Sequence, residues 1–230
     1  MIAAGRFVFL HLHKSGGSFV NEYLLRFVPD ARQVGYHLPY RLIPPESAGL
    51  PVLGFVRNPW SYYVSWYAFQ AQSPQPNPLF RILSEQGRLD FEGTVRNMLE
   101  LGAGGAHLDS LEKALPAGYR NRGLNLPGFE LAGIRGTAQG FYSFLHDHIY
   151  GGADIRHIGH MEKLREELPN MLIGVGQPVT TSMRELLLEA PPVNTSEHGR
   201  YTEYYSKELR ALVAQRDERV IDLYGYRFEE

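Results

Sequence analysis

The sequence of 230 residues contains no cysteine. This excludes disulfide bonds, thiolate metal sites and cysteine nucleophiles, and leaves the redox compartment open. There is also no apolar run of about 18 residues, so no transmembrane helix is expected. The apolar N-terminal stretch is short and leads straight into a glycine turn, which favours a core strand over a signal peptide. We therefore expect a soluble, cytoplasmic protein.

An excess of one charge is lacking as well. Lys and Arg number 23 against 25 for Asp and Glu, which gives a net charge of −2. Such a balance provides no global electrostatic reason to bind nucleic acid, so any anion site must be a local cluster of positive charge. Internal repeats and low-complexity tracts are absent too. The 43% hydrophobic content is enough for one sizeable core, and we expect a single domain over residues 1–230.

Short apolar strand patterns alternate with helical patterns along the chain. Strands are predicted at 6–10, 51–56 and 155–158, and helices at 18–27, 79–101, 141–150, 161–172, 181–189 and 206–224. This alternation predicts an α/β fold with helices flanking a central parallel sheet. Residues 103–136 have little periodicity, and the region 70–136 as a whole is predicted to be a helical and loop-rich insertion facing the substrate.

The segment His11–Ser18 is the first motif with a chemical reading. An apolar strand runs into Lys14, then Gly16 and Gly17, and a helix follows. Backbone N–H groups at a helix start favour an anion, and Lys14 adds a positive charge. In a Walker A loop the lysine follows the glycines, whereas here it precedes them. The alternative is an ordinary strand-to-helix turn with a chance lysine.

A second motif runs from Arg57 to Ser65. A buried strand delivers Arg57 to its C-terminal end, where ligands bind in open parallel sheets. Asn58 is predicted to cap the next helix, with Pro59 in its first position. Arg57 and Ser65 are predicted to hold a second phosphate, since guanidinium binds phosphate oxygens bidentately. Alternatively, Arg57 makes a structural ion pair and Ser65 is a small packing residue.

Together, His13–Ser18 and Arg57–Ser65 resemble the two phosphate motifs of sulfotransferases that use 3′-phosphoadenosine 5′-phosphosulfate. The nearest resemblance is to the bacterial branch related to carbohydrate sulfotransferases. Four further segments are similar to that branch: Gly159–Leu164, Asn194–Ser196, Tyr201–Tyr205 and Tyr224–Phe228. The resemblance spans nearly the whole chain, and the pair of phosphate motifs is more specific than either motif alone.

The resemblance implies a P-loop-like three-layer domain that transfers a sulfuryl group to an acceptor hydroxyl, of a carbohydrate or glycan-like molecule. Lys14 would stabilise the bridging oxygen of the donor, and Ser15, Gly16, Gly17 and Ser18 would hold its 5′-phosphate. Arg57 and Ser65 would hold the 3′-phosphate, and Arg200 would close over that phosphate or the adenine. A solvated loop arginine is the alternative for Arg200. No metal is required.

His37 is the candidate general base, because it resembles the histidine that follows the first phosphate loop in that branch. Its ordinary pKa lets it accept a proton near neutral pH. Glu22, His11 and His13 are rival bases, and His37 without a role is the alternative. His146 and His148 lie two positions apart on a predicted helix, so their rings point apart and a metal site there is not expected.

Two other functions stay open. One is a P-loop kinase-like phosphotransferase, although no convincing Walker B carboxylate is present. The other is a non-catalytic nucleotide-binding module. Neither a nucleic-acid partner nor a stable membrane span is expected, and the sequence does not specify the acceptor or the oligomeric state.

Overall fold

A computed structural model describes residues 1–191 and 197–229. The chain packs as two compact units, and each is described by itself. The sheet unit comprises Met1–Arg57 and Asp147–Asn194, and the helical unit comprises Asn58–His146 and Thr195–Glu230. The similar segment Asn194–Ser196 lies outside the described residues. Among the residues that are described, no helix is both long and apolar enough to cross a membrane.

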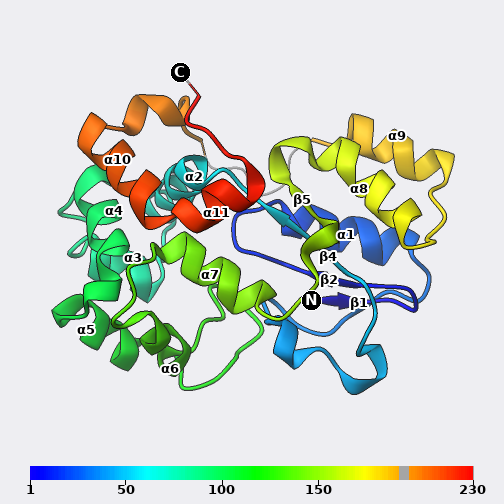
Figure 1. The fold of residues 1–230 in the computed structure, drawn as a ribbon, viewed down its shortest axis with the longest axis horizontal. Coiled ribbons are helices and arrows are strands. Elements are labelled where there is room, and N and C mark those ends of the chain that lie inside the picture. The colour runs from blue at the N-terminus through cyan, green and yellow to red at the C-terminus, as the bar shows by residue number, and fades with distance from the viewer. Residues whose placement is uncertain (192–196, 230) are drawn as a thin grey trace. The chain divides into compact units, whose positions relative to one another are not determined.

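The sheet unit is built on five short strands, and the predicted α/β class is confirmed (Figure 1). The strands are β1 (Ile2–Ala3), β2 (Val8–Leu10), β3 (Arg32–Gln33), β4 (Val52–Val56) and β5 (Ile158–His160). Their order is β3-β1-β2-β4-β5. The strands β2, β4 and β5 pair in parallel, but β1 is antiparallel to both β2 and β3. The sheet is therefore mixed, and the prediction of a parallel sheet is correct only for its β2-β4-β5 part.

A tight turn explains why β1 is antiparallel to β2. The Ala4 N–H donates to the Phe7 carbonyl at 3.0 Å, which closes a hairpin between β1 and β2. The first strand was predicted from residue 6, and the turn delays its start to Val8.

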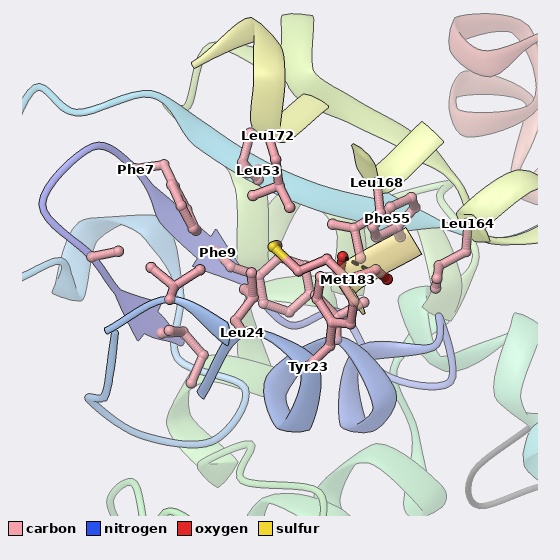
Figure 2. Close-up of a cluster of buried hydrophobic side chains, with 14 of the residues drawn as sticks. Phe7, Phe9, Tyr23, Leu24, Leu53, Phe55, Leu164, Leu168, Leu172 and Met183 are labelled. Atoms are coloured by element: carbon pink, nitrogen blue, oxygen red, sulfur yellow. Dashed lines mark hydrogen bonds between the residues drawn. The ribbon is translucent and has the colours of Figure 1, made fainter. Parts of the chain in front are cut away.

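One face of the sheet carries the core of this unit. Side chains from β2 and β4, among them Phe9, Leu53 and Phe55, pack against three helices (Figure 2). These helices are α1 (Gly17–Phe27), α8 (Leu164–Gly174) and α9 (Thr181–Glu189). Tyr23 of α1 and Met183 of α9 are both buried in this cluster, and the Tyr23 hydroxyl donates to the Met183 carbonyl at 3.3 Å. The core therefore seats α1, and with it the loop that precedes α1, firmly against the sheet.

On the other face of the sheet, a tyrosine hydroxyl contacts two neighbouring strands. Tyr150 ends α7 (Phe141–Tyr150), and its buried hydroxyl lies 3.0 Å from the Phe55 carbonyl and 3.4 Å from the Leu10 carbonyl. A Cβ on Gly54 would lie 2.5 Å from that hydroxyl, so only glycine leaves room for it. Tyr150 thus ties the C-terminal ends of β2 and β4 to one another.

The helical unit contains the remaining α-helices. They are α2 (Pro59–Ala71), α3 (Pro78–Leu83), α4 (Phe91–Leu99), α5 (Ala106–Ala114), α6 (Gly128–Leu131), most of α7, α10 (Lys207–Arg216) and α11 (Glu218–Tyr224). The predicted cap at Asn58 is confirmed: its side chain accepts from the N–H groups of Trp60 and Ser61. The helices at 141–150 and 181–189 are confirmed as well.

Several predicted elements are wrong in detail. The single helix at 79–101 is two helices separated by a turn with positive φ at Glu85, Gln86 and Gly87. The helix at 206–224 is broken at Asp217, and that at 161–172 begins only at Leu164. Residues 155–157 form a 3-10 turn before β5. The segment 103–136 also contains more helix than its composition indicates.

The break at Asp217 centres on a fully buried carboxylate. It accepts hydrogen bonds from the Tyr63 hydroxyl at 2.7 Å and from the Ser143 N–H at 2.8 Å. Asp217 therefore joins α2, α7 and the junction between α10 and α11 within the helical unit. Burial raises the pKa of Asp217 to about 6, because it disfavours the charged form more than the two donors favour it. The contribution of this carboxyl to folding stability accordingly falls as pH rises from about 4 through 6.

A Tyr63→Phe variant tests this account. At pH 8 the ionised carboxylate loses a hydroxyl donor, so we expect the free energy of unfolding to fall by about 1–3 kcal/mol. At pH 5 the carboxyl is mostly protonated and the loss should be smaller. Denaturant unfolding followed by tryptophan fluorescence reports on this unit, because Trp60 and Trp66, the chain's two tryptophans, both lie on α2. Tyr67→Phe on the same helix is the control, and an equal loss at both pH values would contradict the account.

Candidate functional site

The loop between β2 and α1 is held in a strained conformation. Lys14 has a φ of 57° and Gly16 a φ of 75°, so two residues of the turn are left-handed. The left-handed conformation costs a non-glycine residue roughly 1–2 kcal/mol, and such strained residues cluster at functional sites. Gly16 occupies the N-cap position of α1 and provides no side-chain cap. The first-turn N–H groups of α1 therefore receive no side-chain cap from their own helix start, which suits an anion.

The two glycines of this loop leave room for neighbouring side chains. A Cβ on Gly17 would lie 1.8 Å from Cδ2 of His11, and one on Gly16 would lie 2.6 Å from Leu164 Cδ1. The His11 ring thus occupies the space that a larger residue at position 17 would need. His11 is held there by Asn21, whose amide nitrogen lies 3.4 Å from His11 Nδ1. The Gly-Gly pair lets α1 start directly over the His11 ring.

Arg57 and Lys14 meet at the same edge of the sheet. Arg57 directly follows β4, which pairs in parallel with β2, so the residues after the two strands lie at neighbouring strand ends. The Arg57 guanidinium donates through Nη1 to the Lys14 carbonyl at 3.2 Å. Burial, and secondarily the positive charge of Arg57, lower the pKa of Lys14 to about 8. Two half-buried cations side by side form a local positive site in a chain whose net charge is −2.

His37 lies next to this loop and is only 6% exposed. Its Nδ1 lies 2.8 Å from the His11 carbonyl, which can only accept, so Nδ1 carries the proton and Nε2 presents a lone pair. Burial, followed by repulsion from His13 and His11, lowers the pKa of His37 well below its ordinary 6.5. His37 is therefore neutral at physiological pH, and the hydrogen bond from Nδ1 orients its ring so that Nε2 is the nitrogen that can accept a proton.

Tyr36 links His37 to the start of α1. The Tyr36 and Ser18 hydroxyls lie 3.2 Å apart, and the Tyr36 ring contacts the His37 ring edge-on at a centroid distance of 4.8 Å. The sequence predicted no role for Tyr36. The one signal in the sequence that could have indicated a role was its position next to His37. Ser18 is half-buried in the first turn of α1.

The other candidate residues are placed differently. Ser15 is buried and its hydroxyl donates to the His13 carbonyl at 3.3 Å, so its side chain stabilises the loop, and its predicted phosphate contact stays a prediction. Ser65 is buried on α2 and Arg200 is exposed just before Tyr201, and both belong to the helical unit. Within the sheet unit the structure brings together Lys14, Ser18, His37 and Arg57. The contributions of Ser65 and Arg200 stay predictions.

The rival bases and the other histidines have different surroundings. Glu22 is exposed on α1. His146 Nε2 lies 2.9 Å from the Tyr224 hydroxyl in the helical unit. Over residues 1–191 and 197–229 no three His, Asp or Glu side chains are grouped as metal ligands. In the segment after β5, Glu167 accepts from the His160 N–H at 2.7 Å and lies 3.3 Å from His160 Nδ1.

Comparison with known proteins adds no further assignment. No protein-family model matches the chain, and no curated protein matches it. The case for function therefore depends on the sequence motifs and on the geometry of the sheet unit.

A Gly17→Ala variant tests the packing of the loop on His11. The new methyl group collides with a buried ring on a short helix start, so we expect a loss of about 1–3 kcal/mol in the free energy of unfolding. Gly174→Ala in the same unit is the matched control, because its Cβ would meet nothing closer than 3.9 Å. Thermal unfolding followed by circular dichroism checks both variants. A Gly17→Ala protein as stable as the control would show that the His11 ring can move aside at little cost, and would contradict the expected collision.

Proposed function

We propose that this protein is a sulfotransferase that moves a sulfuryl group from 3′-phosphoadenosine 5′-phosphosulfate to an acceptor hydroxyl. The observation that carries the proposal is the meeting of Lys14 and Arg57 at the ends of two parallel strands, beside an uncapped helix start and a neutral histidine. A donor with phosphates at two positions suits two cations delivered from two strand ends. The β2-β4-β5 sheet, with α1 directly after the loop, supports a P-loop-like arrangement.

In this proposal the sheet unit neutralises the leaving nucleotide. Backbone N–H groups at the start of α1 and the Ser18 hydroxyl hold the 5′-phosphate, while Arg57 holds the 3′-phosphate. The Lys14 ammonium faces the oxygen that bridges sulfur and phosphorus. It stabilises the charge that grows there as the S–O bond breaks, and it needs no reorganisation to do so. Bringing Lys14 and Arg57 together disfavours both charges, and binding of a dianion relieves that repulsion.

His37 acts on the acceptor. The acceptor oxygen forms a new bond to sulfur, the bond from sulfur to the 5′-phosphate oxygen breaks, and its electron pair leaves with the nucleotide. Nε2 of His37 takes the acceptor proton and later releases it to water, while Nδ1 keeps its hydrogen bond to the His11 carbonyl. The hydroxyl of a carbohydrate or glycan-like molecule is the acceptor that the resemblance favours. Residues 70–136 are the region expected to select it.

Nucleotide binding separates this function from its rivals. We expect calorimetry to show tight binding of 3′-phosphoadenosine 5′-phosphate, with clearly weaker binding of adenosine 5′-phosphate because the 3′-phosphate contact is lost. Magnesium ATP should bind weakly. Tight binding of magnesium ATP together with weak binding of the bisphosphate would favour a kinase-like enzyme and overturn the proposal.

Lys14→Ala tests the role of the lysine in turnover. If Lys14 acts as an electrostatic group in the transition state, its loss should raise the barrier by roughly 2–4 kcal/mol and lower turnover by about 30- to 900-fold. Turnover is measured as the transfer of the labelled sulfuryl group from the nucleotide donor to each of a panel of hydroxyl acceptors. Lys163→Ala, an exposed lysine of the same unit, is the control and should keep full turnover. Wild-type protein that binds the bisphosphate but transfers no sulfate to any acceptor would indicate a non-catalytic module.

His37→Ala and His37→Gln test the base. Both should keep binding of the bisphosphate, since the ring does not hold the donor, and both should lose turnover by about 10²–10⁴-fold. Glu22→Gln removes the exposed rival carboxylate and should retain full activity. A folded His37→Ala protein with near-normal turnover would exclude His37 from the mechanism.

A further inference from the structure

A second histidine lies against His37 over its whole face. The rings of His13 and His37 are stacked with centroids 3.7 Å apart and planes inclined by 13°. His13 is only 7% exposed, so this stack is almost closed to solvent. Its two members come from the loop after β2 and from the segment after β3, which are separated by more than twenty residues of chain. The function proposed above gives His13 no task.

The stack and its surroundings fix His37 from several sides. One ring face meets His13, the Tyr36 ring lies perpendicular to it, and Nδ1 donates to the His11 carbonyl. The His11 ring lies 4.1 Å away by centroid, inclined at 49°. His37 itself has a φ of 47°, a left-handed conformation that its neighbours must hold in place. These contacts leave the imidazole one orientation.

The same contacts determine which charges His37 experiences. The titratable groups that face it are His13 and His11 from the β2 end, the adjacent Tyr36, and the N-terminal amino group of Met1, whose own pKa burial lowers to about 5. The hydrogen bond to the His11 carbonyl favours a protonated His37, but burial and the neighbouring histidines outweigh it, and no carboxylate adds to it. Two imidazoles at van der Waals contact in a buried site cannot both be protonated at low cost. A charge on either ring therefore disfavours a charge on the other.

We propose that His13 is a positioning residue for His37: its stacked ring holds the imidazole plane, and the close contact of the two rings disfavours a proton on His37 while His13 is charged. That His37 is the base rests on the proposed sulfotransferase function, whereas the effect of His13 on His37 does not. In such an enzyme, activity is lost at low pH when the base takes up a proton. The pH at which this happens would depend on both His13 and His37, not on His37 alone. His13 would then widen the pH range in which Nε2 can accept a proton.

Titration of the folded protein by NMR of the histidine rings tests this effect without any substrate. His13→Phe keeps a flat ring on His37 but removes its charge. We expect the pKa of His37 to rise by at least about half a unit, with the ring-current shift of the His37 Hε1 proton retained. His13→Gln removes both ring and charge, so the pKa should rise and the ring-current shift should disappear. His107→Phe, a half-buried histidine of the helical unit, is the control and should change neither.

The outcomes are distinct from those for the proposed function. An unchanged His37 pKa in both His13 variants would overturn the proposal, whatever the protein catalyses. If His13→Phe does not fold, His13→Gln still decides it by the same titration. In an active enzyme, the acid limb of the kcat/KM profile should move to higher pH in His13→Phe, with kcat/KM at pH 9 and nucleotide affinity preserved. Loss of turnover at every pH in that variant would instead make His13 the base and would also overturn the positioning role.

Discussion

The parallel pairing of β2 with β4 is the constraint on which the site depends. Leu10 is the register partner of Gly54, so both strands end at the same edge and deliver the Lys14 loop and Arg57 side by side. Tyr150 secures this register, because its hydroxyl lies close to carbonyls of both strands and fits only over a glycine at position 54. A shift of one residue would turn every side chain of β4 to the opposite face and would move Arg57 away from Lys14.

In each unit, burial disfavours the charged form of an ionisable group: Asp217 in the helical unit and Lys14 in the sheet unit. The two groups differ in the contacts that surround them. In the helical unit, Asp217 receives two hydrogen bonds from Tyr63 and Ser143, and its task is to join helices. In the sheet unit, Arg57 hydrogen-bonds the Lys14 carbonyl, its charge disfavours that of Lys14, and Lys14 in addition adopts a left-handed backbone. Strain and like charges at one loop are more typical of a binding site than of a structural joint. This contrast makes the Lys14 loop of the sheet unit the candidate binding site.

Local sequence signals predicted the elements whose ends are encoded locally. Asn58 followed by Pro59 starts α2, and the aromatic stretch at 141–150 is one helix, as expected. Two of the wrong predictions join two helices into one, at the turn around Gln86 and at Asp217. At Asp217 the break follows from burial of a carboxylate against Tyr63, more than 150 residues earlier in the chain. Periodicity within a helix contains no information about such a partner.

For the site, the sequence by itself determined that a strand, a lysine, two glycines and a helix follow one another, and that Arg57 directly follows a second strand. Those features depend only on residues that are neighbours in the chain. Helix N-termini favour anions, and ligands bind at the carboxyl ends of parallel strands, so such a local pattern already indicates a site. Only the tertiary structure decided that Ser15 turns inward, that Gly17 lies over His11, and that His13 stacks on His37. These contacts join residues whose proximity depends on how the loops after β2 and β3 fold over the sheet edge, and close packing in a buried space sets them.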